Sequence, residues 1–178
     1  LKKGDKMKLK ISNVLQIIAA VFAVLAIVCL FLPGVTIGNP QIFFGENATG
    51  SISLIGLMFG CGPFKMTVID EAHVINYSGA MSIFGLFAFL LLIAAIILVI
   101  GAFIIKKTNL LIFAGTIAIV AGIFALLVKV AGTNINGGSF TSFMNEFDFR
   151  LGIGTILFAV STILGGGLLV LSKTIKTK

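Results

Sequence analysis

The run FLLLIAAIILVI, residues 89–100, has no polar atom in its side chains and lies inside a longer apolar segment, 80–105. A helix needs about 20 apolar residues to cross a bilayer, so this segment can span one with some tilt. The next apolar segment, 110–130, begins after a connection of four residues, 106–109. So short a connection joins antiparallel neighbours. The sequence therefore predicts a transmembrane helical hairpin with a tight inner turn.

Two further apolar segments, 14–32 and 151–171, extend this pattern to four. Of the 178 residues, 58% are hydrophobic and 11% are charged, and the mean hydropathy is +1.19. Soluble proteins carry about a quarter charged residues. Segment 14–32 follows a basic flank and lacks a small-x-small cleavage site, so we expect an uncleaved signal-anchor helix, with Met7 as one hypothesis for the start of translation. The predicted fold is a single all-α transmembrane domain, 1–178, built as an antiparallel four-helix bundle.

The charges orient this bundle. Ten of the thirteen positive side chains lie at the two ends of the chain and in the 106–109 turn, and with Asp5 they give that side a net charge of +9. The other side has three positive and five negative side chains, a net charge of −2. The positive-inside rule therefore places both termini, including the tail 172–178, in the cytoplasm, and the loops 33–79 and 131–150 outside. Because the basic residues follow this topology, no nucleic-acid partner is expected.

The first outer loop, 33–79, mixes short apolar runs with turn residues and predicts a small β-rich extracytoplasmic cap. Residues 66–77 favour one extended strand, whereas SISLIGLMFG, residues 51–60, is either a strand of a sheet or a helix lying in the interface. In the second outer loop, three Phe at i, i+3 and i+7 predict an amphipathic turn that anchors to the membrane surface or binds a partner. The candidate contact residues are Ser51, Leu54, Met58, Phe59, Cys61, Ile69, Ile75 and Tyr77 in the first loop and Phe140, Phe143 and Phe147 in the second.

Small residues at helical spacing predict where helices approach closely. One stripe comprises Ala19, Ala23 and Ala26, and a second comprises Ala114, Ala118 and Gly122. Three consecutive glycines, 165–167, are either a packing surface or a flexible point. Since backbone hydrogen bonds stay satisfied inside lipid, we expect a continuous helix through them.

The motifs that suggest chemistry are weak. VIDEAH, residues 68–73, is similar to the acidic nucleotide-hydrolysis box of helicases, but the chain has no Gly-Lys pair for a phosphate loop. Asp70, Glu71 and His73 are weak metal candidates, because a strand places only Glu71 and His73 on one face. Cys29 and Cys61 could pair, remain unrelated thiols, or pair between molecules through Cys61. We therefore expect no catalytic residue, cofactor, metal or nucleotide.

The layout of cytoplasmic ends, a long first outer loop, a tight inner turn and a shorter second loop resembles the claudin-type tetraspan architecture. The chain has no Trp and a single loop cysteine, so the claudin Trp-Gly-Leu-Trp-Cys-Cys signature is missing, and the loop disulfide and barrier function are not implied. The Phe-rich texture and Lys-rich start also resemble small bacterial four-helix membrane proteins of uncharacterised function, a resemblance that implies no activity.

The expected function is that of a non-enzymatic integral membrane protein, embedded in the lipid bilayer, whose outer loops mediate homo-oligomer assembly or contact with a protein partner. One alternative is a channel or transporter component, although the span interiors lack the ionisable residues that usually mark ion pathways. The other alternative is a membrane enzyme that uses His73 and the outer carboxylates.

Overall fold

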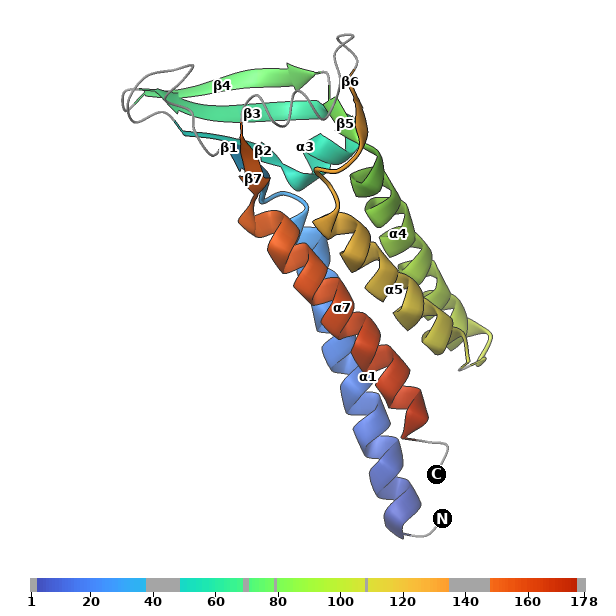
Figure 1. Ribbon diagram of the computed structural model, residues 1–178. Helices are drawn as coiled ribbons and strands as arrows, with labels where there is room; N and C mark the ends of the chain where they lie inside the picture. Colours follow the sequence, from blue (N-terminus) through green and yellow to red (C-terminus); the bar gives the residue numbers. More distant parts are fainter. Residues whose placement is uncertain are drawn as a thin grey trace.

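The computed structural model describes residues 3–37, 49–68, 71–78, 80–107, 109–134 and 148–175, with side chains at 11–36, 50–60, 81–107, 109–132 and 148–175. The chain is mostly helical, with a small antiparallel sheet at one end of the helices and both termini at the other (Figure 1). These are called the sheet end and the terminal end. The helical class and the small antiparallel sheet confirm that part of the sequence prediction.

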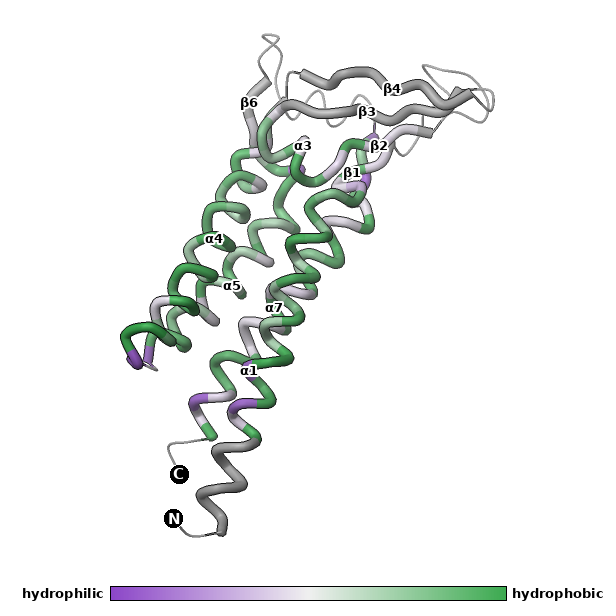
Figure 2. Tube along the Cα trace, turned by 180° about the vertical axis from the view of Figure 1, so that it is seen from behind, coloured by the Kyte–Doolittle hydropathy of each residue, from purple (hydrophilic) through white to green (hydrophobic). Residues whose placement is uncertain are grey.

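Four long helices lie side by side in the described part of the chain: α1 (Lys3–Cys29), α4 (Ile83–Ile104), α5 (Leu110–Leu126) and α7 (Ile153–Thr174). Helix α7 packs between α1 and α5, and α5 packs between α7 and α4. The outermost helices of this row, α1 and α4, are not among the helix pairs that pack closely. Their surfaces are predominantly apolar along most of their length (Figure 2).

Residues 11–29 of α1, all of α4 and all of α7 are long and apolar enough to cross a membrane. Helix α5 has 17 residues and is shorter than its apolar segment, because the chain tightens after Leu126. There the N–H of Leu127 donates to the carbonyl of Phe124 and that of Val128 to Ala125, which are i to i−3 hydrogen bonds of 3.0 and 3.1 Å. Other boundaries also differ from the prediction. Helix α1 begins within the basic flank and ends at Cys29, α4 begins at Ile83 and not at residue 80, and α7 begins at Ile153 and extends to Thr174 into the expected tail.

The five-stranded sheet has the order β4-β3-β2-β1-β7 and is antiparallel throughout. Its strands are β1 (Pro33–Ile37), β2 (Thr49–Ser53), β3 (Cys61–Val68), β4 (Glu71–Ser78) and β7 (Phe149–Leu151). A separate pair joins β5 (Ala80–Ser82) to β6 (Gly132–Asn134). The second loop therefore contributes strands to both sheets, whereas the sequence predicted a cap from the first loop alone.

The prediction of one strand at 66–77 is wrong, because this stretch belongs to a hairpin. Strands β3 and β4 pair over eight positions, from Cys61 opposite Ser78 to Val68 opposite Glu71. Only residues 69 and 70, which lie outside the described part, separate the strands. Two residues is the commonest length for the loop that joins two antiparallel strands in a hairpin.

The run SISLIGLMFG is half strand and half helix. Strand β2 ends at Ser53, whose Oγ accepts a hydrogen bond of 3.2 Å from the N–H of Gly56 and so caps α3 (Leu54–Phe59). Gly60 ends α3 in the left-handed conformation, with φ of 66°. Leu54, Leu57 and Met58 of α3 are fully buried and share one core with the sheet ends of the long helices. The five-stranded sheet and α3 are together called the cap.

Helices α5 and α7 approach closely through glycine. A Cβ added to Gly166 would lie 2.4 Å from the carbonyl oxygen of Gly115, and one added to Gly115 would lie 2.5 Å from that of Gly166. Gly165 instead faces Phe22 of α1, and nothing lies within 4 Å of a Cβ on Gly167. The glycine triplet is therefore a packing surface with two faces, inside the continuous helix that the sequence predicted.

Candidate functional site

The cap is fixed to the helices by hydrogen bonds around β1. The carbonyl oxygen of Gly34 accepts the hydroxyl of Thr155, at 2.7 Å, and the N–H of Gly152, at 2.8 Å. A Cβ on Gly152 would lie 2.2 Å from the carbonyl oxygen of Pro33, so only glycine allows this approach. Strand β1 is thus bonded directly to the start of α7.

A second set of bonds holds α3 against the end of α1. The N–H of Leu54 donates to the carbonyl of Leu32 at 3.0 Å, and the N–H of Ile55 donates to that of Leu30 at 2.9 Å. With these bonds the first turn of α3 obtains acceptors for two N–H groups that a helix leaves unpaired. These hydrogen bonds therefore fix the position of the cap relative to α1 and α7.

Ser82 joins the two helices of the other hairpin, α4 and α5. Its hydroxyl donates to the carbonyl of Val128 at 2.5 Å and accepts the N–H of Gly85 at 3.0 Å, so one buried side chain caps α4 and joins it to the end of α5. The N–H of Ile83 also donates to the carbonyl of Ala131, at 3.0 Å. These bonds connect α4 to the end of α5, and this hairpin meets the cap by packing, because α3, α4 and α5 share one buried core.

Strand β4 is the outermost strand of the sheet on one side. Over its eight residues it pairs with β3, and no other described strand pairs with it. Residues of an antiparallel ladder alternate between hydrogen-bonded and non-hydrogen-bonded pairs. Pro63 has no N–H, so its pairing with Asn76 suits a non-hydrogen-bonded position, at which the polar backbone groups of Asn76 point away from β3. By the same alternation Ala72 and Val74 present their N–H and C=O groups along the edge.

The contact residues predicted in the first loop fall into different environments. Leu54 and Met58 are fully buried between the sheet and the helix ends, so they are core residues and are not available to a partner. Ser51 is half-buried, and Phe59 is 43% exposed with its ring 5.2 Å from that of Phe89 in an edge-to-face contact. The structure describes only the backbone at Cys61, Ile75 and Tyr77, all in β3 and β4. Ile69, Phe140, Phe143 and Phe147 lie outside the described residues.

The weak chemical candidates are only partly described. Glu71 and His73 are alternate residues of β4, whereas Asp70 lies outside the described residues. Among the side chains that the structure describes, no three of His, Cys, Asp and Glu come together. Cys29 is a free thiol, 5% exposed, at the sheet end of α1, so it does not form the disulfide with Cys61 that the sequence allowed.

The two small-residue stripes differ in what they contact. Ala114, Ala118 and Gly122 are all buried on α5, and a Cβ on Gly122 would lie 2.5 Å from the hydroxyl of Thr162 in α7. Ala19 and Ala26 of α1 are buried, but Ala23 is half-exposed and lines a groove that faces α4. In the stripe on α1, Ala19 and Ala26 are therefore buried in the structure, whereas Ala23 faces the groove.

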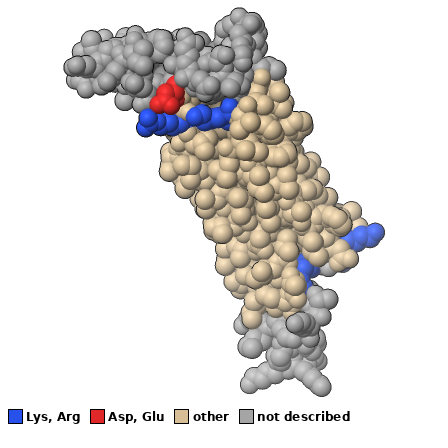
Figure 3. Space-filling model, in the orientation of Figure 1, with Lys and Arg blue, Asp and Glu red and all other residues tan. Residues whose placement is uncertain are grey.

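Charged side chains gather at the two ends of the helices. On the face in Figure 3, a broad band without Lys, Arg, Asp or Glu separates the charged groups near the sheet end from those near the 106–109 turn. At the sheet end Asp148 and Arg150 form an ion pair of 3.1 Å in which both side chains are exposed. Exposed pairs contribute little to stability, so this one chiefly keeps a polar rim beside β7.

Two features were not predicted from the sequence: the open edge of β4 and the groove beside Ala23. The β-branched residues of 66–77 indicated extended structure, but only the pairing order identifies an edge. Comparison with known proteins adds no assignment, since no protein-family model matches the sequence and no curated protein is found to be related to it.

Proposed function

We propose that this chain is a non-enzymatic, four-pass integral membrane protein with both termini in the cytoplasm, and that its outer cap binds another protein by strand addition. The membrane placement is supported by the distribution of side chains. Large apolar residues are exposed on the helices, for example Ile17 (65%), Ile97 (61%) and Phe113 (62%), while Thr155 and Thr162 are buried between them. Lipid is the solvent in which such a surface is stable.

The fourth pass in this proposal is α5 with its extension. Helix α5 alone, at 1.5 Å per residue, is about 26 Å long, slightly short of the roughly 30 Å hydrocarbon core. The tightened turn after Leu126 carries the apolar run on to Val130, and it is there that Lys129 can extend toward the headgroups.

The polar groups between the helices support a role in helix packing and not in transport. The hydroxyl of Thr162 donates to carbonyl oxygens of its own helix, those of Phe158 and Ala159, at 2.9 and 3.1 Å. Ser172 likewise donates to Leu169, and Ser12 donates across the interface to the carbonyl of Ser172, at 2.8 Å. Hydroxyls bonded in this way hold helices together and leave little to line a polar path.

The observation that carries the binding proposal is the open edge of β4. An edge strand of eight residues is a template for an incoming strand. The cap that carries it is hydrogen-bonded to the end of α1 and the start of α7 and shares a buried core with α4 and α5. Strand addition obtains affinity from main-chain hydrogen bonds, so it needs no conspicuous side-chain motif. This would explain why the loop sequence carries none.

The test is Val74→Pro, which removes an N–H from the open edge and leaves the bonds to β3 intact. The matched control is Val74→Ala, which keeps that N–H. Each full-length chain, with a second copy under a different tag, is purified in mild detergent and its associated proteins are identified by mass spectrometry. We expect wild type and Val74→Ala to retain the same associated strand-donating protein, or the second copy, and Val74→Pro to lose it. A monomer without associated protein, or equal retention by Val74→Pro, would overturn the proposal.

A further inference from the structure

A groove of about 540 Å³ runs between α1 and α4 in the half of the helices nearer the terminal end. Its volume lies within the roughly 300–1,000 Å³ range of small-molecule sites. One wall is formed by α1, with three alanines among its six lining residues, the other by large apolar residues of α4, and Leu169 of α7 also lines the groove. The wall residues are Asn13, Gln16, Ile17, Ala19, Ala20 and Ala23 of α1 and Ile96, Val99, Ile100 and Phe103 of α4.

The length of the groove identifies the kind of occupant. From Asn13 to Ala23 the helix rises about 15 Å at 1.5 Å per residue, which is half of a hydrocarbon core of about 30 Å. Toward the sheet end the groove lining stops, and Ala26, Leu92 and the α3 side chain Leu57 belong to one buried core. The groove is therefore closed at one end and matches one leaflet. A spanning helix of a second copy would need a groove along the whole bundle.

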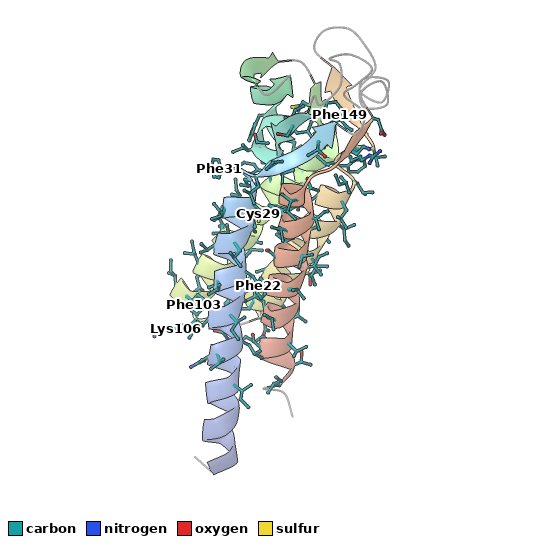
Figure 4. All side chains as sticks on the ribbon, turned by 90° about the vertical axis from the view of Figure 1, so that its left-hand side faces the viewer. Phe22, Cys29, Phe31, Phe103, Lys106 and Phe149 are labelled. Carbon is teal, nitrogen blue, oxygen red and sulfur yellow. The ribbon has the colours of Figure 1, made fainter. Side chains whose placement is uncertain are left out.

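The polarity of the lining orients the occupant. Every lining side chain is apolar except Asn13 and Gln16, which are at the terminal end. This end of the groove, which is not closed by the cap, is called its mouth. There the side-chain amide of Gln16 donates to the hydroxyl of Ser12 at 3.3 Å. Phe103, the last lining residue of α4, and Lys106 lie close together at this end (Figure 4). An apolar tail thus lies toward the sheet end and a polar head lies at the mouth.

The charge near the mouth selects the headgroup. Lys106 and Lys107 are exposed just after α4, and the first eight residues of α1, 3–10, include four Lys and one Asp. Each Lys near a membrane surface favours anionic lipid by about 1 kcal/mol. The charge complementarity therefore favours an anionic headgroup over a zwitterionic one.

We propose that this groove binds one acyl chain of an anionic phospholipid of the cytoplasmic leaflet, with the headgroup near Lys106 and Lys107. The inference rests on the membrane placement proposed above and is independent of the β4 edge. The lipid fills the space that the row of helices leaves open between α1 and α4. The bound lipid would therefore stabilise the terminal half of the helices, which the cap does not contact.

The experiment uses the full-length chain in phosphatidylcholine nanodiscs that contain phosphatidylglycerol with a photoreactive diazirine near the end of one acyl chain. After irradiation, labelled residues are mapped by mass spectrometry. We expect labels concentrated at 16–23 and 96–103. Ala20→Phe fills the groove and should reduce labelling there by about tenfold, a change of about 1.4 kcal/mol in binding. The control Val21→Phe adds the same ring on the exposed side of α1 and should leave groove labelling unchanged.

A second pair of measurements tests the headgroup. Lys106→Gln combined with Lys107→Gln should abolish the preference for the phosphatidylglycerol probe over the same probe built on phosphatidylcholine, while the latter still labels the groove. Even labelling around α1, or no effect of Ala20→Phe, overturns the acyl site. Equal labelling by both probes in the wild type overturns the anionic headgroup. Labels at the exposed positions of α1 show that the chain is in the bilayer, so these failures are distinct from failure of the membrane placement.

Discussion

Gly166 and Gly167 are neighbours in α7 with opposite surroundings, and this contrast can be tested directly. A Cβ on Gly166 would lie 2.4 Å from a backbone carbonyl oxygen of α5, which cannot move aside cheaply, whereas Gly167 faces open space. Gly166→Ala should lower the free energy of unfolding by about 1–3 kcal/mol through overpacking. Gly167→Ala should leave it unchanged or raise it by up to about 1 kcal/mol. Unfolding of both variants in detergent by titrated dodecyl sulfate measures the difference, and equal effects would show that α5 and α7 do not meet at Gly166.

Thr155 tests how strongly the cap is bonded to the helices. Thr155→Val keeps the shape of the side chain but removes the hydroxyl that donates to Gly34. The Gly34 carbonyl still accepts the N–H of Gly152, so it is not left without a partner. We expect a loss of about 0.5–1.5 kcal/mol in the free energy of unfolding. Thr155→Ser, which retains the donor, should be closer to wild type; if it is as unstable as Thr155→Val, packing of the methyl group and not the hydrogen bond is responsible.

Helix α3 is short, and its importance lies in the side chains that it inserts above the long helices. Leu57 is fully buried in the core that includes Ala26, Leu92 and Phe158. Leu57→Ala should create a cavity and cost about 2–5 kcal/mol. Leu57→Met, which conserves volume, should cost less than about 1.5 kcal/mol. The measurement is again unfolding in detergent, together with limited proteolysis of the cap, which should become faster only for Leu57→Ala. Equal proteolysis rates would mean that α3 does not fix the cap.

The elements show which physical signals are local and which are not. The long apolar runs predicted α1, α4 and α7 because burial in an apolar environment requires continuous apolar sequence. The β-branched residues predicted extended structure between 66 and 77, but a hairpin and a single strand share that composition. Strand β7 has three residues and is stabilised by pairing with β1, a contact more than 100 residues away in sequence. Such a strand has no local signature.

Burial at the sheet end also shows why the prediction of Leu54 and Met58 as contact residues was wrong. In a loop that is assumed to face water, Leu54 and Met58 indicate an exposed apolar surface that binds a partner. Their actual partners are side chains of α1, α4, α5 and α7, which only the tertiary structure brings together. The open edge of β4 and the groove between α1 and α4 were missed for the same reason. An edge depends on the order of strands, and a groove depends on which helices fail to touch.

The orientation of the molecule determines what both proposed sites meet, and two exposed positions at opposite ends can report it. Lys107 follows α4 at the terminal end, and Arg150 lies in β7 at the sheet end with its side chain 68% exposed. Each is replaced by Cys in a chain whose native thiols are removed by Cys29→Ala and Cys61→Ser. The positive-inside rule predicts that a membrane-impermeant maleimide labels Arg150→Cys in intact cells and labels Lys107→Cys only after the cells are broken.

The opposite labelling pattern would change both proposals together. The cap would then face the cytoplasm, so a strand-donating partner would have to be cytoplasmic. The groove would open to the outer leaflet, where the anionic lipids that Lys106 and Lys107 favour must also be present for the acyl site to be filled. Labelling of both positions in intact cells would instead show that the chain does not separate its two ends across a membrane. In that case the exposed apolar band on the helices would have to be covered by protein, and the acyl-chain site would have no bilayer to draw from.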